Sequence, residues 1–137
     1  MILVVDSDEV FSKCLVRYFE KAGYAGQMSN NAVQAMEIIN ATTPEMIFID
    51  VYLTGPDGFT LLNELASYPD TMKIPVAIVT DRDFSKYNLN DYNVVGVLNK
   101  ETLRPEEVFL MLDKCLGARF RTCLGMYSEM RPGTKNG

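Results

Sequence analysis

Short apolar runs alternate with amphipathic stretches along most of this chain. Runs of four or five apolar residues are typical of parallel strands that are covered on both faces of a sheet. The stretches between them repeat apolar residues at intervals of three or four positions, which predicts helices with one buried face. The predicted strands are Ile2–Val5, Tyr24–Met28, Met46–Ile49, Pro75–Val79 and Val94–Leu98.

A helix is predicted after each of these strands. Ser29–Asn31 offers N-cap residues for the second helix, and Pro105 suits the first turn of the last one. The helix expected within Arg82–Asn93 is short, because that stretch is polar and rich in asparagine. The helices are expected within residues 11–22, 32–39, 58–65, 82–93 and 105–115.

Five strand–helix units in the first 116 residues predict an α/β fold with one doubly wound parallel sheet. The flavodoxin-like (βα)5 arrangement, with strand order 2-1-3-4-5, is the expected topology. We therefore expect one domain over residues 1–116 and a C-terminal extension over residues 117–137, partly helical or disordered. Apolar residues continue at near-helical spacing from Leu112 to Tyr127, but Gly117 and Gly125 favour a frayed tail as the alternative.

Composition and charge narrow the class of protein. The chain has 137 residues, of which 47% are hydrophobic and 23% are charged, as in a globular domain with one core. No apolar run approaches the ~20 residues of a membrane span, and no signal peptide is evident, so we expect a cytoplasmic protein with no membrane partner. The net charge is −5. Four basic residues against one acidic residue give residues 117–137 a net +3 and leave −8 for the rest, which argues against a nucleic-acid partner.

Two residue types exclude whole classes of chemistry. The chain has no histidine, which rules out Ser-His-Asp and Cys-His catalysis, histidine-based zinc sites and a phosphohistidine step within this chain. Its three cysteines are scattered and form no C-x-x-C motif. We therefore expect reduced thiols rather than disulfides or a zinc site.

Four of the predicted strands end at a residue with useful chemistry: Asp6, Asp50, Thr80 and Lys100. The carboxyl ends of parallel strands meet at one edge of the sheet, where such sheets bind ligands. Two carboxylates there favour a bound Mg²⁺, and a lysine and a hydroxyl can pair with phosphoryl oxygens. Each residue taken singly also has an ordinary structural role, such as a loop cap or a solvated lysine. Together they fit phosphoryl transfer to a carboxylate.

With these strand ends, the chain resembles the receiver domain of response regulators in two-component signalling. The resemblance covers about residues 1–116 and rests on LVVD at Asp6, FID at Asp50, the glycine eight residues after Asp50, VAIVT at Thr80 and VLNK at Lys100. It implies that Asp50 accepts a phosphoryl group, that Thr80 senses it and that Lys100 forms an ion pair.

The resemblance also implies a cofactor and partners. Mg²⁺ would be held by Asp6, Asp50 and the backbone carbonyl of Tyr52, with Asp8 as a further candidate. The phosphoryl donor would be a histidine kinase or a phosphotransfer protein, and phosphorylation would shift the domain between two conformations. Members commonly form homodimers through the fourth helix, fifth strand and fifth helix. The candidate surface residues for such a dimer are Phe109 and Leu110.

Four positions depart from the usual receiver pattern. Ser7 replaces the second of two adjacent acids after the first strand, and Asp8, one residue later, can instead point at the helix N-terminus. We expect weaker Mg²⁺ binding, because a hydroxyl is a poorer ligand than a carboxylate. Asp81 replaces a small residue, Glu101 replaces a proline, and Val97 replaces the aromatic residue that reports phosphorylation by swinging inward.

Three functions compete for this pattern. The first is a phosphoacceptor receiver, which is a signalling domain rather than an enzyme. The second is a pseudo-receiver, a protein-interaction module that works without phosphorylation, and the altered positions favour it. The third is a phosphatase of the haloacid dehalogenase type, but that chemistry needs a second aspartate two residues after Asp50, where Tyr52 stands. A nucleotide-binding enzyme lacks support, since neither G-x-G-x-x-G nor the P-loop motif occurs.

Overall fold

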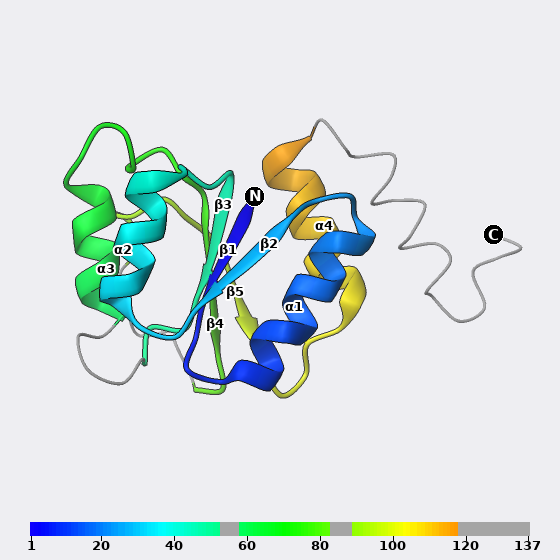
Figure 1. Ribbon diagram of the computed structural model, residues 1–137. Coiled ribbons are helices and arrows are strands. Elements are labelled where there is room, and N and C mark those ends of the chain that lie inside the picture. The colour runs from blue at the N-terminus through cyan, green and yellow to red at the C-terminus, as the bar shows by residue number, and fades with distance from the viewer. Residues whose placement is uncertain (53–57, 83–88, 118–137) are drawn as a thin grey trace, which may run out of the picture.

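The computed structural model describes residues 1–52, 58–82 and 89–117 (Figure 1). The strands are β1 (Ile2–Val5), β2 (Gly26–Ser29), β3 (Met46–Ile49), β4 (Val76–Thr80) and β5 (Val94–Asn99). They form one parallel sheet in the order β2-β1-β3-β4-β5, which confirms the predicted flavodoxin-like topology. β2 and β5 therefore lie at the two edges of the sheet.

Helices cover both faces of this sheet (Figure 1). α1 (Glu9–Lys21) and α4 (Pro105–Leu116) pack on one face, and α2 (Ala32–Ala41) and α3 (Gly58–Ala66) pack on the other. Alternate residues of β1 feed the two cores, because successive side chains of a strand point to opposite faces. None of the described helices has the length and apolar content that spanning a bilayer requires.

Two predicted segments lie largely outside the described residues. The short helix expected within Arg82–Asn93 falls mostly on residues 83–88, and the C-terminal extension falls on residues 118–137. α4 ends at Leu116. The helical or frayed character of the extension, and its boundary with the domain, therefore stay predictions. Of the cysteines, the described Cys14 and Cys115 are free thiols.

β2 begins two residues later than predicted. Gly23 follows α1 with φ of 89°, and its N–H donates to the Glu20 carbonyl at 3.0 Å. The next N–H, that of Tyr24, donates to the Phe19 carbonyl at 2.9 Å. These two bonds form a Schellman cap, in which a glycine takes the left-handed conformation. The cap holds Tyr24 at the helix end, so the strand starts at Gly26.

The face that β5 and α4 present differs from the predicted dimer surface. Val76 pairs with Val94 but the next residue pairs with Gly96, so an extra residue bulges in β5. Val97 is then 43% exposed at the sheet edge. The prediction that Phe109 lies on the surface is wrong, because its ring is fully buried against an α1 tyrosine at 6.1 Å. Leu110 is 46% exposed, as expected.

Candidate functional site

The carboxyl edge of the sheet brings the predicted site residues to one place. β1 and β3 pair in register up to Val5, so Asp6 and Asp50, which follow these strands, lie side by side. The N–H of Asp50 donates to the Val5 carbonyl at 2.9 Å. The N–H of Lys100 donates to the Thr80 carbonyl, also at 2.9 Å, so Lys100 is held where β4 ends.

The ammonium of Lys100 bridges the two carboxylates. Its Nζ lies 2.6 Å from Asp6 Oδ2 and 3.0 Å from Asp50 Oδ2. The side chain of Asp6 is fully buried, and those of Lys100 and Asp50 are 14% and 13% exposed. Water screens these charges poorly, so the attraction between them is stronger than in a surface ion pair. Three of the four residues predicted for phosphoryl transfer are therefore in direct contact.

Burial and ion pairing shift the pKa values of Asp6 and Lys100 in opposite directions. Burial raises the pKa of Asp6, and this effect outweighs the lowering by the Lys100 ammonium and the Asp8 N–H. For Lys100, burial lowers the pKa, but the hydrogen bonds to Asp6 and Asp50 more than offset it and leave the pKa above its usual value. The lysine therefore stays charged at neutral pH, and Asp6 is the group for which ionisation is harder.

Thr80 closes β4, the strand next to β3, at the same edge. Its side chain is buried, and Oγ1 accepts a hydrogen bond from the N–H of Arg82 at 3.1 Å. The Arg82 guanidinium lies 4.4 Å from the centre of the Tyr52 ring, while the Tyr52 N–H donates to Asp50 Oδ1 at 2.9 Å. The sequence pattern did not single out Arg82. The sequence feature that could have pointed to Arg82 is its position two residues after Thr80, which matches the position of Tyr52 two residues after Asp50.

Gly58 fixes the return of the chain beside the acceptor. Its N–H donates to the Val51 carbonyl at 3.0 Å. A Cβ at this position would lie 2.3 Å from Val51 Cα and 2.9 Å from the Asp50 carbonyl oxygen, so only glycine fits. The glycine eight residues after Asp50 therefore packs directly on the backbone that carries the acceptor.

Asp8 and Ser7 do not add a carboxylate to the pair. The Asp8 side chain accepts a hydrogen bond from the Phe11 N–H at 3.0 Å and is the N-cap of α1. This is the alternative place that the sequence left open for it. The N–H of Asp8 donates to Asp6 Oδ1 at 2.9 Å. Ser7 is exposed.

The donor set fits a divalent cation in part. Asp6 and Asp50 offer oxygens of the kind that Mg²⁺ prefers. Asp6 Oδ2 is buried, and the polar partner that the structure gives it among the described residues is the Lys100 ammonium at 2.6 Å. In the same part of the chain, no three Asp, Glu, His or Cys side chains are grouped so as to hold a metal. A cation bound by both carboxylates would compete with Lys100 and would rely on backbone oxygens and water.

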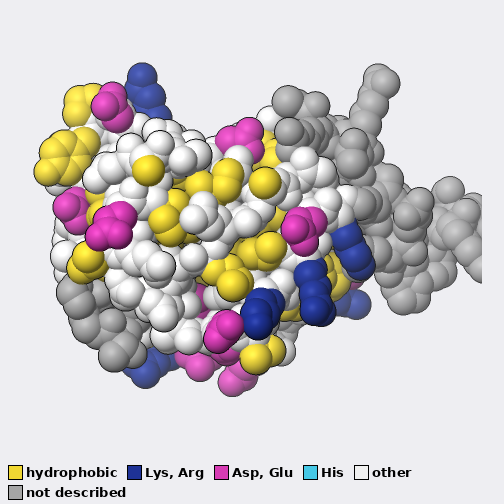
Figure 2. All heavy atoms as spheres, in the orientation of Figure 1, with side chains coloured by type: hydrophobic (Ala, Val, Ile, Leu, Met, Phe, Trp, Pro, Cys, Tyr) yellow, Lys and Arg dark blue, Asp and Glu magenta, His cyan; other side chains and the backbone are white. Residues whose placement is uncertain are grey.

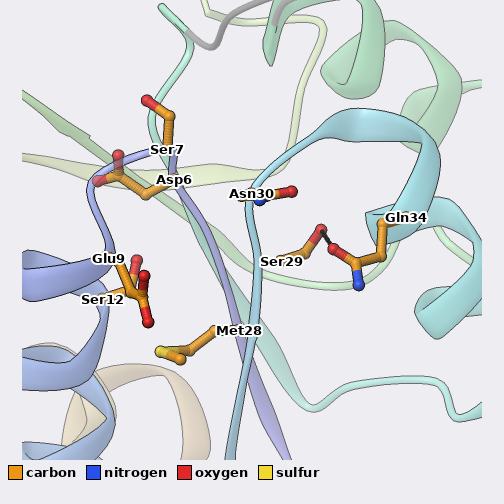
Figure 3. Close-up of a pocket in the computed structure, with 8 residues that line it drawn as sticks. All are labelled: Asp6, Ser7, Glu9, Ser12, Met28, Ser29, Asn30 and Gln34. Carbon is orange, nitrogen blue, oxygen red and sulfur yellow. Dashed lines mark hydrogen bonds between the residues drawn. The ribbon is translucent and has the colours of Figure 1, made fainter.

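A polar cavity of about 270 Å³ borders Asp6, between α1, the end of β2 and the start of α2 (Figure 3). Ser29 Oγ donates to Gln34 Oε1 across its α2 side at 3.3 Å. The acidic site therefore adjoins a polar hollow as well as the hydrophobic core. The lining residues are Asp6, Ser7, Glu9, Ser12, Met28, Ser29, Asn30 and Gln34.

Most of the chain is similar in sequence to one family of proteins. Residues 2–113 match the family described as the response regulator receiver domain. The chain is 30% identical over 115 residues to protein Rrf1 of Nitratidesulfovibrio vulgaris. The aligned segment covers 84% of this chain and 81% of that protein. It is 27% identical over 113 residues to the probable transcriptional regulator ycf29 of Porphyra purpurea. That aligned segment covers 81% of this chain and 54% of ycf29. The chain thus spans about half the length of ycf29.

Solved structures show the same architecture. A putative response regulator from Chloroflexus aurantiacus superimposes with a TM-score of 0.76 at 25% identity, covering 85% of this chain and 96% of that one. The receiver domain of the sensor histidine kinase PA1611 from Pseudomonas aeruginosa superimposes with a TM-score of 0.72 at 16% identity, covering 85% and 97%. That second structure has a magnesium ion coordinated in its active site cleft.

Proposed function

The chain belongs to the response regulator receiver domain family, and we propose that it accepts a phosphoryl group on Asp50 and signals by a change of conformation. The observation that carries the proposal is the Lys100 ammonium, 3.0 Å from Asp50 Oδ2 and 2.6 Å from Asp6 Oδ2. A phosphoryl group on Asp50 would bring negative charge to a site where a cation already stands. The donor would be a histidine kinase or a phosphotransfer protein.

In the proposed reaction, a carboxylate oxygen of Asp50 attacks the phosphorus of the donor. The bond between phosphorus and the leaving atom breaks, and the leaving group keeps the electron pair. The Tyr52 N–H donates to Asp50 Oδ1, and the Lys100 ammonium lies 3.0 Å from Oδ2. Oδ2 is the proposed nucleophile, because a phosphoryl group attached there would lie beside this cation. Lys100 then stabilises the charge on the transferred group, and the Thr80 hydroxyl, at the end of the neighbouring strand, donates to it.

Mg²⁺ would supply further positive charge to the phosphoryl oxygens when bound. Receiver domains generally bind this ion, as the PA1611 domain does. The proposed ligands here are Asp6, Asp50 and the backbone carbonyl of Tyr52. Binding should be weak, because Ser7 offers no carboxylate and because Lys100 competes for both acids.

One observation favours the second function, a pseudo-receiver that binds partners without phosphorylation. Val97 stands where receivers commonly carry an aromatic switch residue, and it is 43% exposed on the edge strand β5. A valine has no ring to swing inward, so phosphorylation of Asp50 would need another route to the surface. A homodimer through this side of the domain, with exposed Leu110, stays a prediction.

Intact mass spectrometry after incubation with acetyl phosphate and MgCl₂ separates the two functions. We expect the wild type to gain one phosphoryl group and Asp50→Asn to gain none. Asp81→Asn is the matched control, because Asp81 is an exposed carboxylate beside Thr80 that is not proposed as an acceptor. An unmodified wild type would reject the phosphoacceptor function. The interaction module would then require that Asp50→Asn binds partners as the wild type does.

A further inference from the structure

The Lys100 ammonium has a third neighbour besides the two carboxylates. It lies over the aromatic ring of Phe11, on α1, with Nζ 5.0 Å from the ring centre. The same Nζ is 2.6 Å from Asp6 Oδ2 and 3.0 Å from Asp50 Oδ2. Figure 2 shows Lys and Arg side chains that stand out over α1 into solvent, and Lys13 is 59% exposed. Lys100 is 14% exposed, because two acids and a ring surround its charge.

The ring attracts the lysine without neutralising it. The face of an aromatic ring carries the negative part of its quadrupole and attracts an ammonium within about 6 Å of the ring centre, more strongly where water is excluded. An ammonium has three N–H donors, so the two carboxylate oxygens leave part of it for another neighbour. A third carboxylate there would cancel the charge that a phosphoryl group needs. A ring holds the ammonium in place and leaves its charge available.

The first turn of α1 determines where this ring lies. Phe11, Leu15 and Phe19 follow one another at four-residue intervals and form one apolar stripe of the helix. Leu15 and Phe19 are fully buried, whereas Phe11, at the end nearest the acidic site, is half-buried. The Phe11 N–H donates to the N-cap Asp8 at 3.0 Å, and the Asp8 N–H donates to Asp6 Oδ1 at 2.9 Å. Asp8 thus ties the turn that carries the ring to the buried acid of the site.

We propose that Phe11 is a positioning residue for phosphoryl transfer, whose ring face holds the Lys100 ammonium beside Asp50. The proposal rests on the proposed function of Asp50 as the phosphoacceptor. Without the ring, Lys100 would keep its ion pairs, but its side chain would sample more orientations and water would reach its open side. The ammonium would then be in place less often to stabilise the transferred group, and the reaction would slow.

Core packing alone makes a different prediction for Phe11. An apolar stripe needs only an apolar side chain, so leucine would continue it, and a ring of the same shape would serve whatever its electrons. Positioning requires the negative face of the ring. The order of the Lys100 side chain and the rate of phosphorylation should therefore both follow the electron density of the ring.

NMR relaxation of the Lys100 Cε–Hε group, on the full chain, measures the order of this side chain. In the wild type it should be more ordered than the same group of exposed Lys13, and its Hε signals should be shifted upfield by the ring. Phe11→Leu should remove that shift and lower the order toward that of Lys13. Trifluorophenylalanine at position 11 keeps nearly the same shape but weakens the negative face, so the order should be intermediate.

The rate of phosphorylation by acetyl phosphate with MgCl₂, followed by intact mass, provides the second measurement. Phe11→Leu should slow the reaction about fivefold and trifluorophenylalanine about twofold. Tyr18→Leu is the matched control. It removes an aromatic ring from the same helix, but that ring packs edge-on against Phe109 at 6.1 Å. The control should leave the rate and the order of Lys100 as in the wild type.

Three results would overturn the proposal. The first is wild-type behaviour of the trifluorophenylalanine variant in both measurements, because shape alone would then be sufficient. The second is equal order of Lys100 in the wild type and Phe11→Leu. The third is an equal loss of rate in Tyr18→Leu and Phe11→Leu, which would assign the effect to looser packing of α1. A wild type that takes up no phosphoryl group would instead reject the function of Asp50, and the order of Lys100 would still decide whether the ring holds the ammonium.

Discussion

Replacing Lys100 with methionine should destabilise the protein by about 3 kcal/mol at pH 8 without Mg²⁺. Its ammonium lies 2.6 Å from Asp6, which is fully buried, and 3.0 Å from Asp50, which is 13% exposed. Removal of one partner leaves uncompensated buried charge, which costs about 3–5 kcal/mol. The lower end applies here, because Asp50 keeps some contact with water and Asp6 can take up a proton.

The loss should shrink at acid pH. Burial raises the pKa of Asp6 and the ammonium lowers it, so the pKa rises further in Lys100→Met. An acid with a raised folded-state pKa favours folding when protonated, so the variant regains stability as pH falls through that pKa. The raised pKa of Lys100 acts in a different pH range. The stability that the charged lysine contributes to the folded wild type is complete below the pKa of the unfolded lysine, and it is lost only as pH rises through the folded-state pKa.

Urea unfolding followed by circular dichroism at pH 5 and pH 8, in EDTA, measures both effects. Lys13→Met is the control, since it removes a lysine from an ion pair whose side chains are 59% and 72% exposed. That change should cost less than about 0.5 kcal/mol at either pH. Equal losses in the two variants, or the same Lys100→Met loss at both pH values, would refute the view that this ammonium neutralises buried charge.

Three further substitutions test neighbouring parts of the site. Gly58→Ala should cost about 2 kcal/mol in thermal unfolding, because its Cβ would lie 2.3 Å from Val51 Cα, and an unchanged Tm would contradict this close approach. Ser7→Asp should tighten Mg²⁺ about tenfold in titration calorimetry by adding a carboxylate, whereas equal affinities would place residue 7 outside the metal shell. Asp8→Ala should cost about 1 kcal/mol through loss of the α1 N-cap bond to Phe11, with Mg²⁺ affinity unchanged; a large loss of affinity would make Asp8 a ligand.

The sheet and the pairing of its strand ends were predictable because their signals are local. Each buried strand is a short apolar run, and the polar residue follows directly, as Asp50 follows Met46–Ile49. Parallel order then brings the strand ends to one edge. The nearness of Asp6, Asp50 and Lys100 follows from topology before any side chain is placed.

The features that escaped prediction depend on contacts between distant segments. The helical period of α4 leaves Phe109 outside the buried stripe, but α1 supplies a second neighbour, Tyr18, that buries it. The bulge in β5 could not be predicted, because a short apolar run looks the same with or without an extra residue in the pairing. The stacking of Arg82 on Tyr52 joins residues that follow two different strands. The spacing of apolar residues predicts which face of a single helix or strand is buried. These contacts depend on how two separate elements meet, which that spacing does not describe.

The bridging position of Lys100 connects the altered metal shell to the proposed phosphorylation. One ammonium serves two carboxylates, so it cannot fully compensate both. A phosphoryl group on Asp50 would draw the ammonium toward its own oxygens and leave Asp6 buried without its partner. Asp6 would then have to bind a cation or take up a proton, and Ser7 offers no second acid to strengthen the cation site. By linkage, whatever occupies Asp6 in the phosphorylated state also sets how readily Asp50 is phosphorylated. We therefore expect phosphorylation to depend more steeply on Mg²⁺ and pH here than in a receiver with adjacent acids.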